Sequence, residues 1–339
     1  MAQVVLGLGT SHSPQMSSGT SYWDGHAGRD RANDFLVDAE GRVRTFDELV
    51  AEAPASLAAE LVPEVWEAKW RRVQDAIAGL VKRLADAAPD VAVIVGDDQH
   101  ELFGEDGNPA IGLFLGDELW DAGLGETERA KLPPDILPAQ WAAHASGREA
   151  YPVARELSNH LAGALTVAGF DIGVFSVQGP DRTLGHAFTF PRRRLQLAPE
   201  VPIVPVALNA YYPPNVPPPD RCWALGRALR QALEDWPGAE RVALIASGGL
   251  SHFVISEDLD HRVLKALEEG DGAAVAGLPR DVLRSGSSEI LNWLVVGGAL
   301  AGWDFDIIDY VPAYRSPAGT GVGMGFATWQ PPTGGPVPA

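Results

Sequence analysis

The sequence predicts an α/β fold, with a mostly parallel central sheet flanked by helices and an inserted lid segment. Five short apolar runs rich in Val and Ile are typical of buried strands. Between them, apolar residues recur at the three- and four-residue spacing of amphipathic helices. Strands that alternate with helices require crossover connections, which favour a parallel sheet covered on both faces. In such a fold the ligand binds beyond the carboxyl ends of the strands.

The predicted elements follow one another along most of the chain. A single domain is expected over residues 1–330, followed by a disordered, Pro- and Gly-rich tail over 331–339. A helix is expected from Glu289 to Leu300, because its sequence is largely apolar and begins after a serine-rich segment. The other expected elements are strands at 4–8, 91–95, 172–177, 203–208 and 242–246, and helices covering 66–84, 153–165 and 225–233.

Two segments interrupt this alternation. Residues from about 18 to 60 are predicted to form an insertion or lid, with a turn at Asp38-Ala39-Glu40-Gly41 between two short extended pieces. The sequence Thr45-Phe46-Asp47-Glu48 fits a capping box that opens a helix. Residues 105–146 are irregular and rich in Gly, Pro and Trp, and they are expected to cover the binding pocket.

Composition limits the classes of function. The net charge of −19 disfavours nucleic-acid or anionic-membrane partners, which bind clustered Lys and Arg. The single cysteine, Cys222, excludes an internal disulfide and any site built from several cysteines. No apolar run approaches the length of about 20 residues that spans a bilayer, and no basic segment precedes an apolar one at the N-terminus. A soluble, cytoplasmic protein is therefore expected.

Four histidines follow predicted strands and could lie on one rim of the sheet: His12, His100, His186 and His252. Each one alone is more often a loop residue bonded to backbone than a ligand, but the four together indicate a shared site. A histidine cluster without cysteine suits zinc or non-haem iron. His26 lies in the insertion and is open to either interpretation. The remaining three are expected at the surface: His144, His160 and His261.

The carboxylate that completes such a site is less clear. Glu289 is best placed, because a serine-capped helix start would hold it rigidly and favour its charge. Equally, it could be an ordinary acidic residue of a first helical turn. Asp97 and Asp98 follow a strand, where such residues bind a metal, orient a histidine or close a turn.

Five motifs together resemble the class III extradiol ring-cleaving dioxygenases, the relatives of the catalytic beta subunit of protocatechuate 4,5-dioxygenase. Their order and rough spacing match from Gly7 to about Gly325. The insertion, with its DAEGRVRTFDEL, is most similar to the 3-O-methylgallate dioxygenase branch. The motifs are GTSHSP (9–14), GDDQHE (96–101), GHAFTFP (185–191), SGGLSH (247–252) and GSSEILNWL (286–294).

The resemblance implies an α/β core that binds Fe(II) through His12, His100 and Glu289. It also implies His252 as the catalytic acid and base, and His186 as a second pocket histidine that contacts substrate or oxygen. The sequence departs from the family at one ligand. An Asn-Asp-His sequence carries the second ligand in the protocatechuate branch, and an ungapped alignment places Gln99 there, with His100 one residue late. His100 is the preferred ligand, with Asp98 as the alternative.

The implied reaction is cleavage of a catechol-type ring by dioxygen, on a substrate that often carries a carboxylate, such as protocatechuate, gallate or 3-O-methylgallate. Arg315 and Thr189 are the candidate partners of that carboxylate, with Asp98 also placed near the substrate. Arg315 could equally form an ordinary ion pair. The resemblance further implies a homodimer or larger homo-oligomer, although some members use a small partner subunit. Two alternatives stay open on the same scaffold: a zinc hydrolase and a non-catalytic binding protein.

Overall fold

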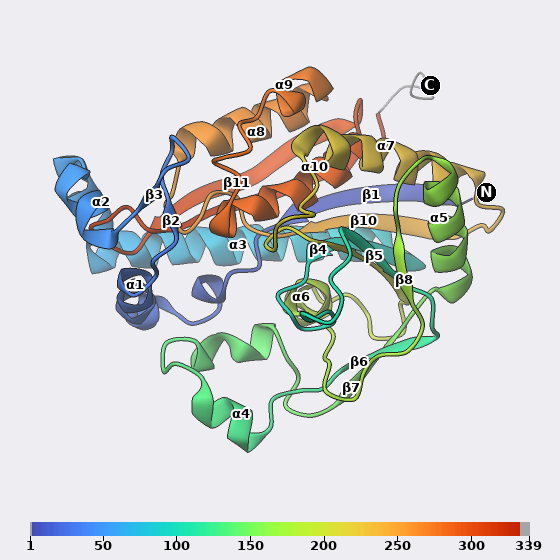
Figure 1. Cartoon of the computed structure of the whole chain (residues 1–339), viewed down its shortest axis with the longest axis horizontal. Helices are drawn as coiled ribbons and strands as arrows, with labels where there is room; N and C mark the ends of the chain where they lie inside the picture. Colours follow the sequence, from blue (N-terminus) through green and yellow to red (C-terminus); the bar gives the residue numbers. More distant parts are fainter. Residues whose placement is uncertain (1, 333–339) are drawn as a thin grey trace.

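The computed structural model describes residues 2–332, and its centre is an eight-stranded sheet in the order β11-β12-β1-β10-β4-β9-β5-β8 (Figure 1). Four neighbouring strands at its middle run parallel. They are β1 (Gln3–Thr10), β10 (Arg241–Ser247), β4 (Val91–Asp97) and β9 (Ile203–Leu208). The predicted α/β class with its mostly parallel sheet is therefore confirmed.

The outer strands include antiparallel pairings that the sequence pattern did not predict. On one side, β12 (Gly321–Gln330) runs antiparallel to β1, and β11 (Asp304–Tyr314) runs antiparallel to β12. On the other side, β5 (Ile111–Phe114) runs antiparallel to β9, and β8 (Gly173–Phe175) pairs parallel with β5. Glycines interrupt the apolar pattern of β12, and β11 alternates acidic with apolar residues, so neither resembles a continuous Val and Ile run.

The central strands are apolar throughout because both faces of the sheet are covered. In β4, Val93 and Val95 pack into one apolar cluster and Ala92 and Ile94 into another on the opposite face. Successive side chains of a strand point to opposite faces, so each face needs its own layer. One layer contains α5 (Arg155–Val167), α7 (Pro219–Asp235), α8 (Glu257–Glu269), α9 (Gly272–Ala276) and α10 (Ile290–Ala299), and the other α3 (Pro63–Ala87) and α6 (His186–Arg194).

The predicted amphipathic helices correspond to α3, α5 and α7. In α3, Pro63 occupies the first turn, where its missing N–H costs nothing, and Ala88 ends the helix in a left-handed conformation. Its buried stripe includes Val73, Leu80 and Leu84, which recur at helical spacing. Burial of this stripe against the sheet, rather than intrinsic propensity, stabilises the helix.

The segment expected to form an insertion contains the short elements that its turn and capping signals predicted. A hairpin of β2 (Leu36–Val37) and β3 (Val43–Arg44) turns at Gly41, whose φ of 78° lies in the left-handed region. The capping box of Thr45 and Glu48 opens α2 (Phe46–Glu52). Three further elements complete the segment: η2 (Thr20–Tyr22), α1 (Trp23–Arg31) and η3 (Ala55–Leu61).

The second irregular region protrudes beside α6 in Figure 1. It contains β6 (Glu118–Asp121), which pairs with β7 (Glu149–Pro152), and between them α4 (Glu126–Lys131) and η4 (Leu137–Ala142). The two remaining short helices are η1 (Pro14–Met16) and η5 (Ser285–Glu289). Most of the tail expected to be disordered, 333–339, lies outside the described residues. Across the described chain, no helix combines the length and the hydrophobicity that crossing a bilayer requires.

Candidate functional site

A cavity of about 410 Å³ lies at the carboxyl ends of the central parallel strands, where an α/β sheet places its ligands. His12 follows β1, His252 follows β10, and Glu289 ends η5 before α10 begins. His186 starts α6. All four side chains line the cavity. Three of the four histidines predicted to share a rim therefore meet there, together with the predicted glutamate.

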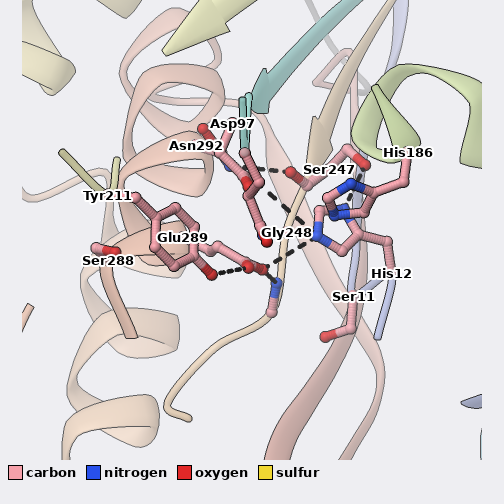
Figure 2. Close-up of polar contacts among 12 residues, drawn as sticks. Ser11, His12, Asp97, His186, Tyr211, Ser247, Gly248, Ser288, Glu289 and Asn292 are labelled. Atoms are coloured by element: carbon pink, nitrogen blue, oxygen red, sulfur yellow. Dashed lines mark hydrogen bonds and ion pairs between the residues drawn. The ribbon is translucent and has the colours of Figure 1, made fainter. Parts of the chain in front are cut away.

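His12 presents a buried ring nitrogen to two carboxylates. Its Nε2 atom lies 3.2 Å from Oε2 of Glu289 and 3.9 Å from Oδ1 of Asp97, but forms no hydrogen bond within the described chain. Its Nδ1 atom lies 3.1 Å from the hydroxyl of Ser247 (Figure 2). A buried polar atom without a hydrogen-bond partner is costly unless another ligand compensates it. A cation between this nitrogen and the carboxylates would do so.

Glu289 is held by groups from the loops that follow β9 and β10. Oε2 accepts the backbone N–H of Gly249 at 2.6 Å, and Oε1 accepts the hydroxyl of Tyr211. Oε1 also lies 3.2 Å from Nε2 of His252. Burial by itself would raise the pKa of Glu289, but the facing His252 and His12 lower that pKa well below its ordinary value. Glu289 is therefore a carboxylate at neutral pH.

The expected serine cap of this helix is absent. Glu289 itself occupies the N-cap position of α10, and no side chain caps the helix there. The carboxylate is fixed by Gly249 and Tyr211 instead. Trp293 anchors the helix to the strand ends by donating its indole N–H to the Gly248 carbonyl at 2.8 Å.

Asp97 and His186 complete the set of donors around His12. Single donor atoms of His12, Asp97 and His186 all lie within 4.8 Å of one another, an arrangement suited to a metal ion. Asp97 is the last residue of β4 and is fully buried. Its Oδ1 accepts from Nδ2 of Asn292 and its Oδ2 from Nε2 of Gln99, each at 3.1 Å. Burial and the nearby Glu289 raise the pKa of Asp97.

His186 is oriented by a carboxylate behind it. Oε1 of Glu101 lies 2.8 Å from Nδ1 of His186 and accepts the backbone N–H of the same residue at 2.9 Å. Burial would lower the pKa of His186, but Glu101 outweighs it and raises the pKa to about 10. The ring packs edge-on against His12, with centroids 4.6 Å apart.

Hydrogen bonds to Leu250 and Ser287 fix the orientation of His252. Nδ1 lies 2.7 Å from the carbonyl oxygen of Leu250, so it carries the proton and leaves Nε2 to face Glu289. The hydroxyl of Ser287 accepts the N–H of His252 and donates to its carbonyl. Burial opposes the charge, but Glu289 raises the pKa of His252. Gly286 admits the ring, since a Cβ atom there would lie 2.0 Å from Cδ2 of His252.

Comparison with known proteins agrees with this arrangement. Residues 49–325 match the family described as the catalytic LigB subunit of aromatic ring-opening dioxygenase, which covers most of the chain. The chain belongs to this family. A gallate dioxygenase of Pseudomonas putida is 30% identical over 165 residues, which is 43% of this chain and 45% of that enzyme. The alignment thus spans less than half of the relative's length. The resemblance carried by the five motifs is confirmed.

The LigB-family match includes His186, His252 and Glu289, whereas His12 precedes its first residue. Three other residues that sequence patterns selected, His100, Asp98 and Thr189, do not line the cavity. His100 is exposed, has a φ of 63°, and stacks on Tyr212 with centroids 3.8 Å apart. It does not line the cavity. The structure therefore does not bring His100 to the other predicted ligands.

Asp98 and Thr189 are also buried in local structure rather than aimed at the cavity. Asp98 closes its loop by accepting the backbone N–H groups of Leu102 at 2.8 Å and Phe103 at 3.1 Å. Thr189 donates its hydroxyl to backbone carbonyl oxygens. Neither residue lines the cavity. These hydrogen bonds to the backbone explain why the motifs contain polar residues at these positions, and no bound substrate or metal is needed to account for them.

Arg315 does line the cavity, but its charge is already matched. Nε and Nη2 bind the carboxylate of Asp30 at 2.7 and 2.8 Å, and Nη1 donates to Gln15 at 2.8 Å. The ordinary ion pair that sequence analysis left open is thus present, although it is buried. Asp30 comes from α1, so this pair fastens the insertion to the loop after β11.

Sequence reasoning missed several residues that line the cavity. Tyr211 follows β9 in the same way as His12 follows β1. A search for polar side chains after every predicted strand, and not for histidines alone, could have selected it. His144, expected at the surface, lines the cavity because Asp121 binds its Nδ1 at 2.9 Å. Arg29 and His26 reach the cavity from α1. The region expected to cover the pocket contributes residues such as Leu132.

Proposed function

We propose that this chain is a non-haem Fe(II)-dependent extradiol dioxygenase that cleaves the ring of a catechol-type substrate with O2. One observation carries the proposal: in a LigB-family chain, the buried Nε2 atom of His12 faces the carboxylates of Glu289 and Asp97 with no hydrogen bond in the described structure. These donors fit a metal ion, and the adjoining cavity has room for a single aromatic ring.

His12, Glu289 and Asp97 would hold the metal. Asp97 takes the place predicted for His100, because it ends the same strand and is already oriented by Asn292. Three protein ligands would leave other coordination positions of the ion open. This set has one imidazole and two carboxylates, whereas the common oxygen-activating iron site has two histidines and one carboxylate. Bound Fe(II) would supply adjacent coordination positions for the catechol hydroxyls and dioxygen.

The surrounding residues have distinct tasks. In its neutral form, His252 accepts a proton from a substrate hydroxyl at Nε2, and in its protonated form it returns that proton to an oxygen atom of the opening ring. The hydrogen bond from Nδ1 to Leu250 keeps Nε2 aimed at the cavity. His186 is held by Glu101 as a charged donor that faces substrate oxygen. Gly249 and Tyr211 fix the direction of Glu289.

Oxygen consumption by protein loaded anaerobically with ferrous iron tests this function. With protocatechuate, gallate or 3-O-methylgallate, we expect one equivalent of O2 per substrate and a new absorbance from a ring-opened product. The variants His12→Ala and Glu289→Ala should lose this uptake. His160→Ala is a matched control, because that imidazole binds the Ala232 carbonyl away from the cavity. No uptake with any of the three substrates, despite one equivalent of bound iron, would contradict the proposal.

A further inference from the structure

The cavity that contains the candidate metal ligands is also lined by apolar residues and by two arginines. Leu132, Ala139, Ala142 and Ala143 provide apolar surface suited to the face of an aromatic ring. Two arginines, Arg29 and Arg315, also line this cavity. A guanidinium that lines an apolar cavity can bind an anionic substituent through charge-assisted hydrogen bonds.

The charge of Arg315 is already matched inside the protein. Arg315 and Asp30 form a bidentate pair in which both side chains are at most 4% exposed, and Gln15 takes the remaining terminal nitrogen. Arg315 is therefore buried, and Asp30 matches its charge.

Arg29 differs in exposure and in pairing. Its side chain is 41% exposed, and its Nε donates to Oδ2 of Asp135 at 2.7 Å. Its Nη2 lies 2.6 Å from Nδ1 of His26, while Nη1 donates to none of the described side chains. Asp135 does not line the cavity, whereas Arg29 does. The counterion of Arg29 thus lies outside the cavity lining, and Nη1 is left for a ligand.

His26 reinforces this orientation without adding charge. Because a guanidinium only donates, Nδ1 of His26 must accept from Arg29, so the imidazole is neutral and its Nε2 donates to the hydroxyl of Ser18 at 3.1 Å. Burial, together with Arg315 and Arg29, lowers the pKa of His26 to about 3, and it outweighs the opposite effect of Asp135, whose Oδ2 lies 3.2 Å from Nδ1. The ring therefore fixes Arg29 in place as a neutral acceptor.

We propose that Arg29 is the specificity-determining residue that binds the carboxylate of an aromatic substrate whose hydroxyls face His12 and Glu289. This inference rests on the proposed function and deepens it, since it selects carboxylated catechols over catechol itself. The cation comes from the insertion helix α1, so the insertion supplies the substrate specificity while the strand ends supply the metal ligands.

The test compares protocatechuate with catechol, which has the same ring and hydroxyls but no carboxylate. Dissociation constants are measured anaerobically by calorimetry on the iron-loaded protein, and KM and kcat by oxygen uptake. In Arg29→Gln, we expect protocatechuate to bind about 10- to 100-fold more weakly, as for loss of a charge-assisted hydrogen bond, with kcat little changed. Catechol should bind within about twofold of the wild-type value. Arg29→Lys should restore part of the loss.

Arg31→Gln is the matched control, because Arg31 lies on the same helix, is 61% exposed and pairs with Asp47 outside the cavity. Misfolding of Arg29→Gln would weaken both ligands together, so the ratio of the two dissociation constants isolates the carboxylate contact. An unchanged ratio in Arg29→Gln, or a wild-type protein that binds both ligands equally, would overturn the assignment of Arg29. A wild-type protein that turns over neither of these ligands, nor gallate or 3-O-methylgallate, would instead contradict the proposed function.

Discussion

Nε2 of His12 lies 3.2 Å from Oε2 of Glu289, joining the end of the first strand to the start of the last helix. The distance permits a hydrogen bond, but the geometry does not form one, and the nitrogen is buried. Both groups are already aimed at the same space before any ligand binds. Such preorganisation lowers the free-energy cost of assembling a metal site.

Substituting Asp97 and His100 separately tests which of them is the metal ligand that follows or ends β4. Asp97→Asn should lose most of its bound iron, measured by atomic emission after gel filtration, because it removes a charged oxygen donor from the centre of the cluster. His100→Ala should keep its iron and its activity, because the ring stacks on Tyr212 in an exposed loop. The opposite pattern would return the ligand role to His100.

Tyr211 is expected to position Glu289 rather than to react. Tyr211→Phe removes the hydroxyl that donates to Oε1, and we expect metal affinity to fall by about tenfold, as for loss of other outer-shell partners. Competition with a chromogenic chelator measures this affinity. Tyr212→Phe is the natural control, since its ring contacts His100 instead. Equal metal affinity in the two variants would refute the positioning role.

The buried pair between Asp30 and Arg315 should dominate the attachment of the insertion. Asp30→Ala leaves the guanidinium buried without a counterion, so the free energy of unfolding should fall by about 3–5 kcal/mol. Removing the carboxylate of the exposed pair with Asp47→Ala should cost less than about 1 kcal/mol. Urea unfolding of both variants gives the comparison, and similar losses would contradict a special role for the buried pair.

His26 should make stability depend on pH. Its pKa is about 3 in the folded protein against 6.5 as the ordinary value, so the folded state binds fewer protons than the unfolded state between these values. The stabilisation is complete above pH 6.5 and is lost as the pH falls toward 3. Between pH 6.5 and 5, the loss should be about 2 kcal/mol.

Urea unfolding at several pH values measures this dependence. In His26→Gln, which retains a polar side chain beside Arg29, the part of the pH dependence due to this histidine should disappear. His261→Gln, at an exposed position, should keep the wild-type dependence. A wild-type slope that survives in His26→Gln would mean that another group is responsible.

The sequence by itself determined the central strands, the amphipathic helices and the strand-end location of the site. Runs such as 91–95 are apolar at every position because both faces of the strand are covered, and that requirement is visible without coordinates. His12 and His252 could be selected because polar side chains directly after buried strands meet at one edge of a parallel sheet.

Only the tertiary structure decided which neighbouring side chains reach the cluster. Asp97 is still part of β4 and points into the site, whereas the left-handed backbone at His100 turns its ring onto Tyr212. One residue along a strand reverses the direction of a side chain, and a loop changes it further, so no motif fixes the ligand. Arg29 and Arg315 differ for a similar reason. Folding pairs Arg29 with Asp135 and Arg315 with Asp30 across long stretches of sequence, and it buries only the second pair completely.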